Sequence, residues 1–184
     1  MTAAPRKRYD AIAMSLHWVI AGLLIFMIVF GEDLMKSAEH ATGPDGALGA
    51  SIHASIGVAV LVLSVIRLGW RFGHPPPPAP ATMKPWERTV MGVTHVLFYV
   101  LMIGLPLSGW LAFAAFLPEA PAAADARLFG LFTIPAAPLV GDFVKGIHGL
   151  GSNLLMVLVI LHVLAALKHQ FIDRDGVLRR MLPG

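Results

Sequence analysis

Histidines within apolar stretches are the side chains in this sequence best suited to chemistry. Of its eight histidines, four lie in or at the edge of long apolar runs: His17, His53, His148 and His162. Ionisable side chains at such depth are costly and are therefore functional candidates. A neutral imidazole offers a lone pair without burying net charge, which suits an axial ligand of haem iron. The alternative for any single one is a helix-end residue that hydrogen-bonds a neighbour or reaches towards an interface.

The spacing of these four histidines predicts two facing pairs. If the apolar runs form an up-and-down bundle, His17 lies near the start of the first helix and His53 lies near the opposite end, where the second helix begins. The last run carries both His148 and His162, whose 14-residue separation gives about 21 Å of rise on nearly one helix face. We therefore expect His17 to face His162 and His53 to face His148, with room for two stacked bis-histidine haems.

The elements that must position these histidines are four apolar segments, at about residues 12–30, 50–70, 90–116 and 146–168. Each is close to the roughly 20 residues that span a hydrocarbon core. With 57% hydrophobic and only 14% charged residues, the 184-residue chain lacks the polar surface of a soluble globule. The composition predicts an all-α integral membrane four-helix bundle, as a single domain over residues 1–184.

Cysteine is absent, which excludes disulfides, thiolate-bound iron–sulfur clusters and covalent attachment of c-type haem. Any haem would then be bound without a thioether link to the chain. The apolar stretch from Ile12 to Gly31 is longer than the roughly 7–15 residues of a signal-peptide core, so we expect a retained helix. Polar residues 32–49 predict a loop, the proline-rich residues 74–85 a non-helical connection, and residues 120–138 a segment along the interface.

Basic residues predict the orientation. Eleven of the 14 lysines and arginines fall on the side that holds both termini, and three fall on the other. The first group is Arg6, Lys7, Arg8, Arg67, Arg71, Lys84, Arg88, Lys168, Arg174, Arg179 and Arg180, and the second is Lys36, Arg127 and Lys145. The positive-inside rule then places both termini in the cytoplasm.

Further candidates lie near the inner histidine pair. Arg67 and Arg71 could hold haem propionates, or they could be ordinary positive-inside anchors. His169 lies seven residues beyond His162 on the same face, and His95 lies near the inner start of the third helix. Either could hydrogen-bond a quinone and move protons, or could simply cap a helix end. No residue is assigned a catalytic role.

Four stretches of the sequence resemble one known family. RYDAIAMSLHW, IHASIGVAVLVLSVIRLGWR, THVLFYVLMIGLPLSGW and KGIHGLGSNLLMVLVILHVLAALKHQFIDRDGVLRRMLP are similar to the bacterial cytochrome b561 family over nearly the whole chain. The resemblance implies a dihaem bundle in the bacterial inner membrane with His17, His53, His148 and His162 as the axial ligands. The b subunits of membrane hydrogenases and formate dehydrogenases show a related two-level pattern.

One branch of this family, the superoxide oxidases, is similar in the stretches AALKHQF and LRRMLP. That likeness implies oxidation of superoxide outside and reduction of ubiquinone inside, with His169 at the quinone site. The acidic outer loops depart from it, because a positive field would steer superoxide better. Two alternatives stay open: an anchor subunit that passes electrons between a partner dehydrogenase or periplasmic protein and quinone, and a haem-free four-helix membrane protein.

Overall fold

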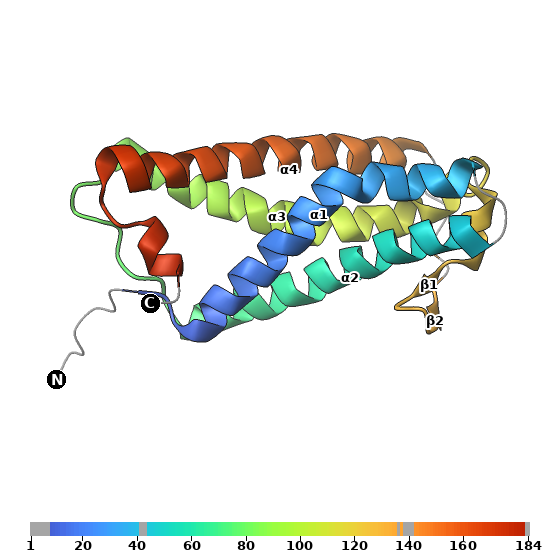
Figure 1. Cartoon of the computed structure of the whole chain (residues 1–184), viewed down its shortest axis with the longest axis horizontal. Coiled ribbons are helices and arrows are strands. Elements are labelled where there is room, and N and C mark those ends of the chain that lie inside the picture. The colour runs from blue at the N-terminus through green and yellow to red at the C-terminus, as the bar shows by residue number, and fades with distance from the viewer. Residues whose placement is uncertain (1–7, 41–43, 136, 138–141, 183–184) are drawn as a thin grey trace.

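Four long helices form most of the protein, in agreement with the prediction of an all-α membrane bundle (Figure 1). The computed structural model describes residues 8–40, 44–135, 137 and 142–182. The helices are α1 (Ala11–His40), α2 (Pro44–Gly73), α3 (Pro85–Phe116) and α4 (Asp142–Lys168). The shorter elements are the helical turns η1 (Pro121–Asp125), η2 (His169–Asp173) and η3 (Leu178–Met181) and the antiparallel strands β1 (Arg127–Leu128) and β2 (Phe132–Thr133).

Each long helix is apolar and long enough to cross a membrane. Most of the apolar side chains on these helices point outward, with only a small fraction of each apolar window buried inside the protein. That arrangement is stable in lipid, where outward apolar groups need no cover and helices satisfy their own backbone groups. The structure therefore confirms the fold class.

The helices extend further than the apolar pattern indicates. α1 runs 30 residues, about 45 Å, against a hydrocarbon core of about 30 Å. The predicted loop over residues 32–49 is wrong, because α1 continues to His40 and α2 begins at Pro44. An ion pair at i,i+4 between Lys36 and Glu32, at 2.6 Å, supports the polar end of α1. Proline suits the first turn of a helix, so Pro44 begins α2 without loss.

The other connections are closer to expectation. Residues 74–84 are non-helical, and Pro85 begins α3, where a Glu87 carboxylate oxygen accepts the Lys84 backbone N–H at 2.9 Å. The predicted interfacial segment contains η1 and the β1–β2 hairpin. Two serine hydroxyls on α2 fix this hairpin, since Ser51 accepts the Arg127 N–H and Ser55 accepts the Phe129 N–H.

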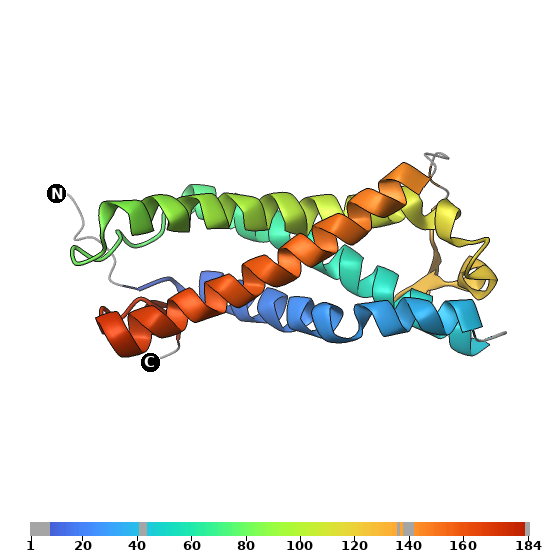
Figure 2. The ribbon, with the colours of Figure 1, turned by 90° about the horizontal axis from the view of Figure 1, so that it is seen from above.

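The bundle consists of two helix pairs. α1 packs against α2, α3 packs against α4, and the two pairs meet mainly through α2 and α3. In the described part of the chain α1 and α4 barely touch, and α4 runs obliquely across the bundle (Figure 2). The central packing layer is Ile20, Leu24, Val60, Met102 and Leu155. This apolar layer lies midway along the helices.

Gly151 allows the close approach of α4 to α3. A Cβ atom at this position would lie 2.7 Å from the Leu105 Cδ2 atom, a distance that carbon atoms do not tolerate. Small residues at helix interfaces are a common means of packing membrane helices. The α3–α4 pair is therefore tightly closed at this level.

The two ends of the bundle differ. One, the hairpin end, holds η1, the β1–β2 hairpin, the last residues of α1 and the first residues of α2 (Figure 1). The other, the terminal end, holds residues 8–10, 74–84 and 174–182. There the Trp18 indole donates to the Met181 carbonyl at 2.7 Å, and Arg180 donates to the Pro78 carbonyl at 2.5 Å. These contacts join the first and last described segments to the proline-rich connection.

Candidate cofactor sites in the bundle

At the hairpin end, His53 of α2 and His148 of α4 face each other with ring centres 6.2 Å apart. The Nδ1 atom of His53 lies 3.0 Å from the Gly31 carbonyl of α1, and that of His148 lies 3.0 Å from the Leu105 carbonyl of α3. A carbonyl only accepts, so each Nδ1 carries the proton and each Nε2 keeps its lone pair. Histidine ligands of metals are typically held in this way, with the second ring nitrogen donating to a carbonyl.

At the other level, three imidazoles meet where the sequence predicts two. His17 of α1 and His162 of α4 have ring centres 6.3 Å apart, and His95 of α3 lies 6.0 Å from His162. Phe98 packs edge-on against the His162 ring at 5.2 Å. All three histidines are half-buried. His95, predicted as a quinone contact, therefore lies beside the predicted haem ligands.

The ring spacings match what an iron porphyrin between two imidazoles requires. An iron–imidazole bond of about 2 Å and a ring-centre offset of about 1 Å on each side put the two ring centres about 6 Å apart. The two predicted pairs measure 6.2 Å and 6.3 Å. Neutral nitrogen donors facing each other across this gap suit b-type haem.

Helix packing distinguishes the possible partners of His162. Phe98 of α3 packs edge-on against the His162 ring, so the side of His162 that faces α3 is already in contact with a side chain. α1 and α4 make almost no direct contact in the described part of the chain, so the gap between His17 and His162 can admit a flat ring. A porphyrin therefore fits the α1–α4 gap with less rearrangement.

Two glycines that the sequence pattern does not indicate lie beside the hairpin-end pair. A Cβ atom at Gly109 would lie 2.9 Å from the Cε1 atom of His148, and one at Gly31 would lie 3.7 Å from the His53 ring. The α3 and α1 backbones thus contact the two imidazoles directly. Ser108 adds a hydroxyl 3.2 Å from the His148 Nδ1 atom. The sequence gives only a weak signal for these residues, because their role depends on tertiary contact rather than on periodicity.

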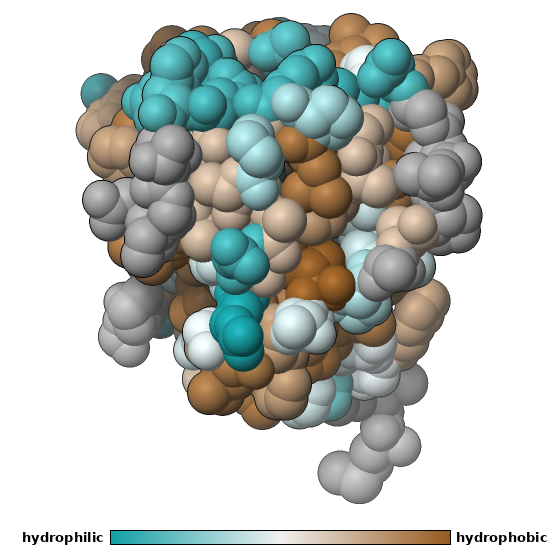
Figure 3. All heavy atoms as spheres, turned by 90° about the vertical axis from the view of Figure 1, so that its right-hand side faces the viewer, coloured by the Kyte–Doolittle hydropathy of each residue, from teal (hydrophilic) through white to brown (hydrophobic). Residues whose placement is uncertain are grey.

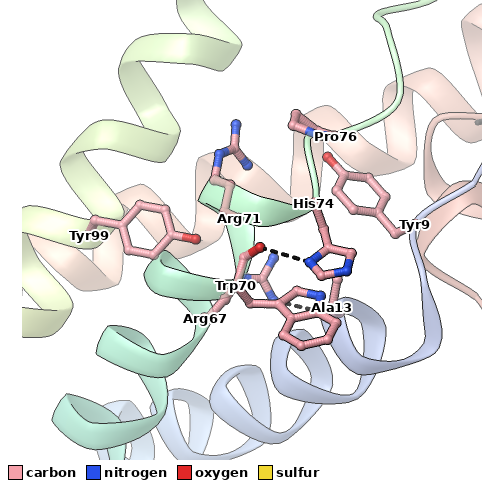
Figure 4. Close-up of a pocket in the computed structure, with 8 residues that line it drawn as sticks. All are labelled: Tyr9, Ala13, Arg67, Trp70, Arg71, His74, Pro76 and Tyr99. Atoms are coloured by element: carbon pink, nitrogen blue, oxygen red, sulfur yellow. Dashed lines mark hydrogen bonds between the residues drawn. The ribbon is translucent and has the colours of Figure 1, made fainter. Parts of the chain in front are cut away.

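Arg67 and Arg71 line a small, open pocket at the terminal end (Figure 4). Arg67 donates to the Ala13 carbonyl at 3.1 Å, one turn before His17 on α1, and acts electrostatically on His17 and His162. In Figure 4 Tyr99 extends its hydroxyl from α3 towards α2. The remaining lining residues are Tyr9, Ala13, Trp70, His74 and Pro76.

Asp10 organises the wall of this pocket. Its carboxylate accepts the Ala13 backbone N–H at 2.9 Å and the Trp70 indole N–H at 3.1 Å, and the Trp70 ring stacks on His74 at 3.9 Å. Burial raises the pKa of Asp10, but these hydrogen bonds outweigh it and hold the pKa below its usual value.

His169 lies apart from the three-imidazole cluster, at the C-terminal end of α4. It is buried, and its Nδ1 atom lies 2.7 Å from an Asp175 carboxylate oxygen and 3.1 Å from one of Asp173. Glu87, His169 and Asp173 are close enough to hold a metal ion. However, the Lys168 ammonium already bonds both carboxylates, at 2.9 Å and 2.5 Å. A built-in cation therefore occupies the place that a metal would take.

The described charges at the hairpin end are mostly acidic. Lys36 pairs with Glu32 and Lys145 pairs with Glu119, but Asp33, Glu39, Asp125 and Asp142 add further carboxylates. Viewed end-on, polar residues gather along one edge of this face, while apolar residues extend over much of the rest (Figure 3). The described residues do not build a broad positive surface here.

A membrane-spanning four-helix bundle that presents facing imidazoles at two levels defines a haem-binding membrane protein. A model of the prokaryotic cytochrome b561 family matches residues 8–184, and the chain belongs to that family. It is similar to cytochrome b561 homolog 2 of Escherichia coli, at 30% identity over 96% of this chain and 92% of the relative.

Two further relatives are also 30% identical. Cytochrome b562 of Cereibacter sphaeroides aligns over 95% of this chain and 94% of its own length. The probable superoxide oxidase CybB of Yersinia pestis aligns over 96% of this chain and 97% of its own length. The family and the four helices make this chain a haem b protein of the bacterial inner membrane that transfers electrons.

Proposed function

We propose that the chain binds two b-type haems and carries electrons through the membrane to ubiquinone. One haem would lie between His53 and His148, the other between His17 and His162. The observation that carries the proposal is the presence of two imidazole pairs, one near each end of the bundle, at the spacing that iron requires. Each haem supplies a one-electron carrier when bound.

The direction across the membrane follows from charge. The described lysines and arginines that were predicted to face the cytoplasm lie at the terminal end or on the parts of the helices next to it. Lys36, Arg127 and Lys145 lie at the hairpin end. Arg6 and Lys7 lie outside the described residues. The positive-inside rule supports a cytoplasmic terminal end and a periplasmic hairpin end.

Arg67 and Arg71 would receive the propionates of the inner haem. Arg67 supports this role because it is held beside His17 by the Ala13 carbonyl, and guanidinium groups bind carboxylates bidentately. The alternative, plain anchoring at the interface, would leave the guanidinium facing lipid headgroups. The pocket that both arginines line favours a bound anionic group.

Ubiquinone would be reduced near the inner haem, with His169 and His95 as candidate contacts. His95 lies within the inner histidine cluster, and His169 is buried in η2, which follows directly after the helix α4 that carries His162. Reduction to ubiquinol takes two electrons and two protons, and histidine is suited to deliver protons near neutral pH.

Superoxide is the proposed outer donor, because a relative of this chain is named a probable superoxide oxidase. Two superoxide ions would lose one electron each, giving two molecules of oxygen and the electrons for one quinone. The excess of carboxylates at the hairpin end would repel superoxide rather than steer it, so association should become faster as added salt screens this repulsion.

Haem content and haem-reduction kinetics test this proposal. His53→Ala or His148→Ala should lose the outer haem, and His17→Ala or His162→Ala the inner one, as measured by pyridine haemochrome and optical redox titration. Purified protein in nanodiscs should show haem reduction on anaerobic addition of superoxide, followed by reoxidation when quinone is added. A measured content of one haem per chain in the wild type would contradict the two-haem proposal. No reduction by superoxide, together with co-purification of a dehydrogenase subunit, would instead support an anchor role.

A further inference from the structure

The chain makes an unusual turn directly after α4. His169–Asp173 form a π-helical turn, Arg174 has a left-handed φ of 54°, and Gly176 has a φ of 75°. π-turns and left-handed residues other than glycine are uncommon and often mark functional sites. The result of this turn is that the chain doubles back, and the Asp175 N–H reaches the His169 carbonyl at 3.3 Å.

The reversal brings the Asp175 carboxylate onto the His169 ring. The Nδ1–Oδ2 distance is 2.7 Å, and only 2% of the Asp175 side chain is exposed. The other carboxylate oxygen accepts the Val177 N–H at 3.2 Å, which fixes its position. A carboxylate oxygen accepts only, so Nδ1 carries the proton. Nε2 makes no hydrogen bond to any described residue and is the atom left to act on a ligand.

The other charged side chains near His169 bind mainly to other partners. On α3, Glu87 binds Lys168 and also acts electrostatically on His169. Asp173 binds Lys168 at 2.5 Å and approaches the His169 ring less closely than Asp175 does. On η3, Arg180 donates to the Pro78 carbonyl, away from this site. Asp175 is therefore the buried carboxylate dedicated to His169.

We propose that Asp175 is a positioning residue for proton delivery to the quinone, acting through His169. This inference rests on the proposed quinone reduction at the cytoplasmic side. Asp175 fixes the ring orientation and holds the Nδ1 proton, so that Nε2 faces the ligand. As electrons reach the quinone, a protonated Nε2 gives its proton to a quinone oxygen, with Nδ1–H still bonded to Asp175.

Reduction of one quinone to quinol takes two electrons and two protons. The inner haem would supply the electrons one at a time, and His169 would donate one proton for each. His169 recovers each proton from cytoplasmic water, so no further reactant is needed. Removal of a carboxylate that orients a functional imidazole typically costs about tenfold to a hundredfold. We expect a loss of that size in quinone reduction by Asp175→Asn.

The test uses full-length protein in nanodiscs, with its haems reduced by dithionite, and follows haem reoxidation in a stopped-flow instrument. Wild type, Asp175→Asn, Asp173→Asn and His169→Ala are each mixed with decylubiquinone or with ferricyanide, which accepts an electron without a proton. We expect Asp175→Asn to slow reoxidation by decylubiquinone about tenfold or more. Ferricyanide rates and haem content should be unchanged, and Asp173→Asn should stay within about twofold of the wild type.

The outcomes separate the two ideas. If wild-type haem is not reoxidised by decylubiquinone, the proposed function fails. If His169→Ala slows quinone reduction but Asp175→Asn matches the wild type, the quinone site stands and the role of Asp175 is overturned. Equal slowing by Asp173→Asn, or slower ferricyanide reaction in Asp175→Asn, would also overturn it, because either result indicates a general structural effect.

Discussion

Gly109→Ala should weaken binding of the proposed outer haem, although it replaces none of the proposed ligands. The new Cβ atom would lie 2.9 Å from the His148 Cε1 atom and 3.2 Å from Nδ1, whereas favourable contacts lie at about 3.5–4.0 Å. The ring must retreat by roughly half an ångström or more, which strains its 3.0 Å hydrogen bond to the Leu105 carbonyl. Overpacking of this kind costs about 1–3 kcal/mol. That cost corresponds to roughly tenfold to hundredfold weaker haem retention.

The assay is haem stoichiometry combined with a redox titration of the purified variant. Gly104→Ala is the matched control, because it lies on the same helix and a Cβ atom there meets nothing within 4 Å. We expect Gly109→Ala to lose outer haem on dilution or to shift its potential, while the inner haem and the control stay as in the wild type. Two fully retained haems with unchanged potentials, or loss of the inner haem first, would refute the reasoning.

Three further outcomes are expected. His95→Gln should keep both haems in a haem-content assay, because His17 is the proposed partner of His162; loss of the inner haem would assign that role to His95. Asp10→Asn should lower the melting temperature at neutral pH, measured in detergent. The folded-state pKa of Asp10 is lowered, so its stabilisation is present above the unfolded value of about 3.9 and disappears as the pH falls through the folded value. If the melting temperature of Asp10→Asn remained below that of the wild type at acidic pH, this explanation would be contradicted. Lys168→Met should remove the ion pair between α3 and α4 and lower the stability by less than about 1 kcal/mol, because the lysine side chain is 40% exposed. We expect unchanged haem spectra and a slightly lower melting temperature. Loss of haem would argue against a purely stabilising role.

The sequence was sufficient to predict the helices and the histidine pairs. Apolar length and helix rise are local properties, and the depth of His17, His53, His148 and His162 follows from them. The measured ring spacings agree with the predicted pairing, although the assignment of these rings as haem ligands stays a prediction. Composition also predicted the membrane environment correctly.

Other features depend on contacts between distant segments. The third imidazole of the inner cluster, His95, was predicted near the inner end, but its approach to His162 depends on how α3 packs against α4. The carbonyls that orient His53 and His148 belong to neighbouring helices and carry no side-chain signal. The polar end of α1 was mistaken for a loop, because hydropathy reports the membrane boundary rather than the end of a helix.

α4 provides one ring to each facing pair, His148 at one end and His162 at the other. A nascent chain that has inserted only its first three helices therefore holds His17 and His53 without their partners. Capture of the two proposed haems would therefore wait until the last helix enters the membrane and crosses the bundle. Insertion would be completed first, and the same helix would then enclose both porphyrins.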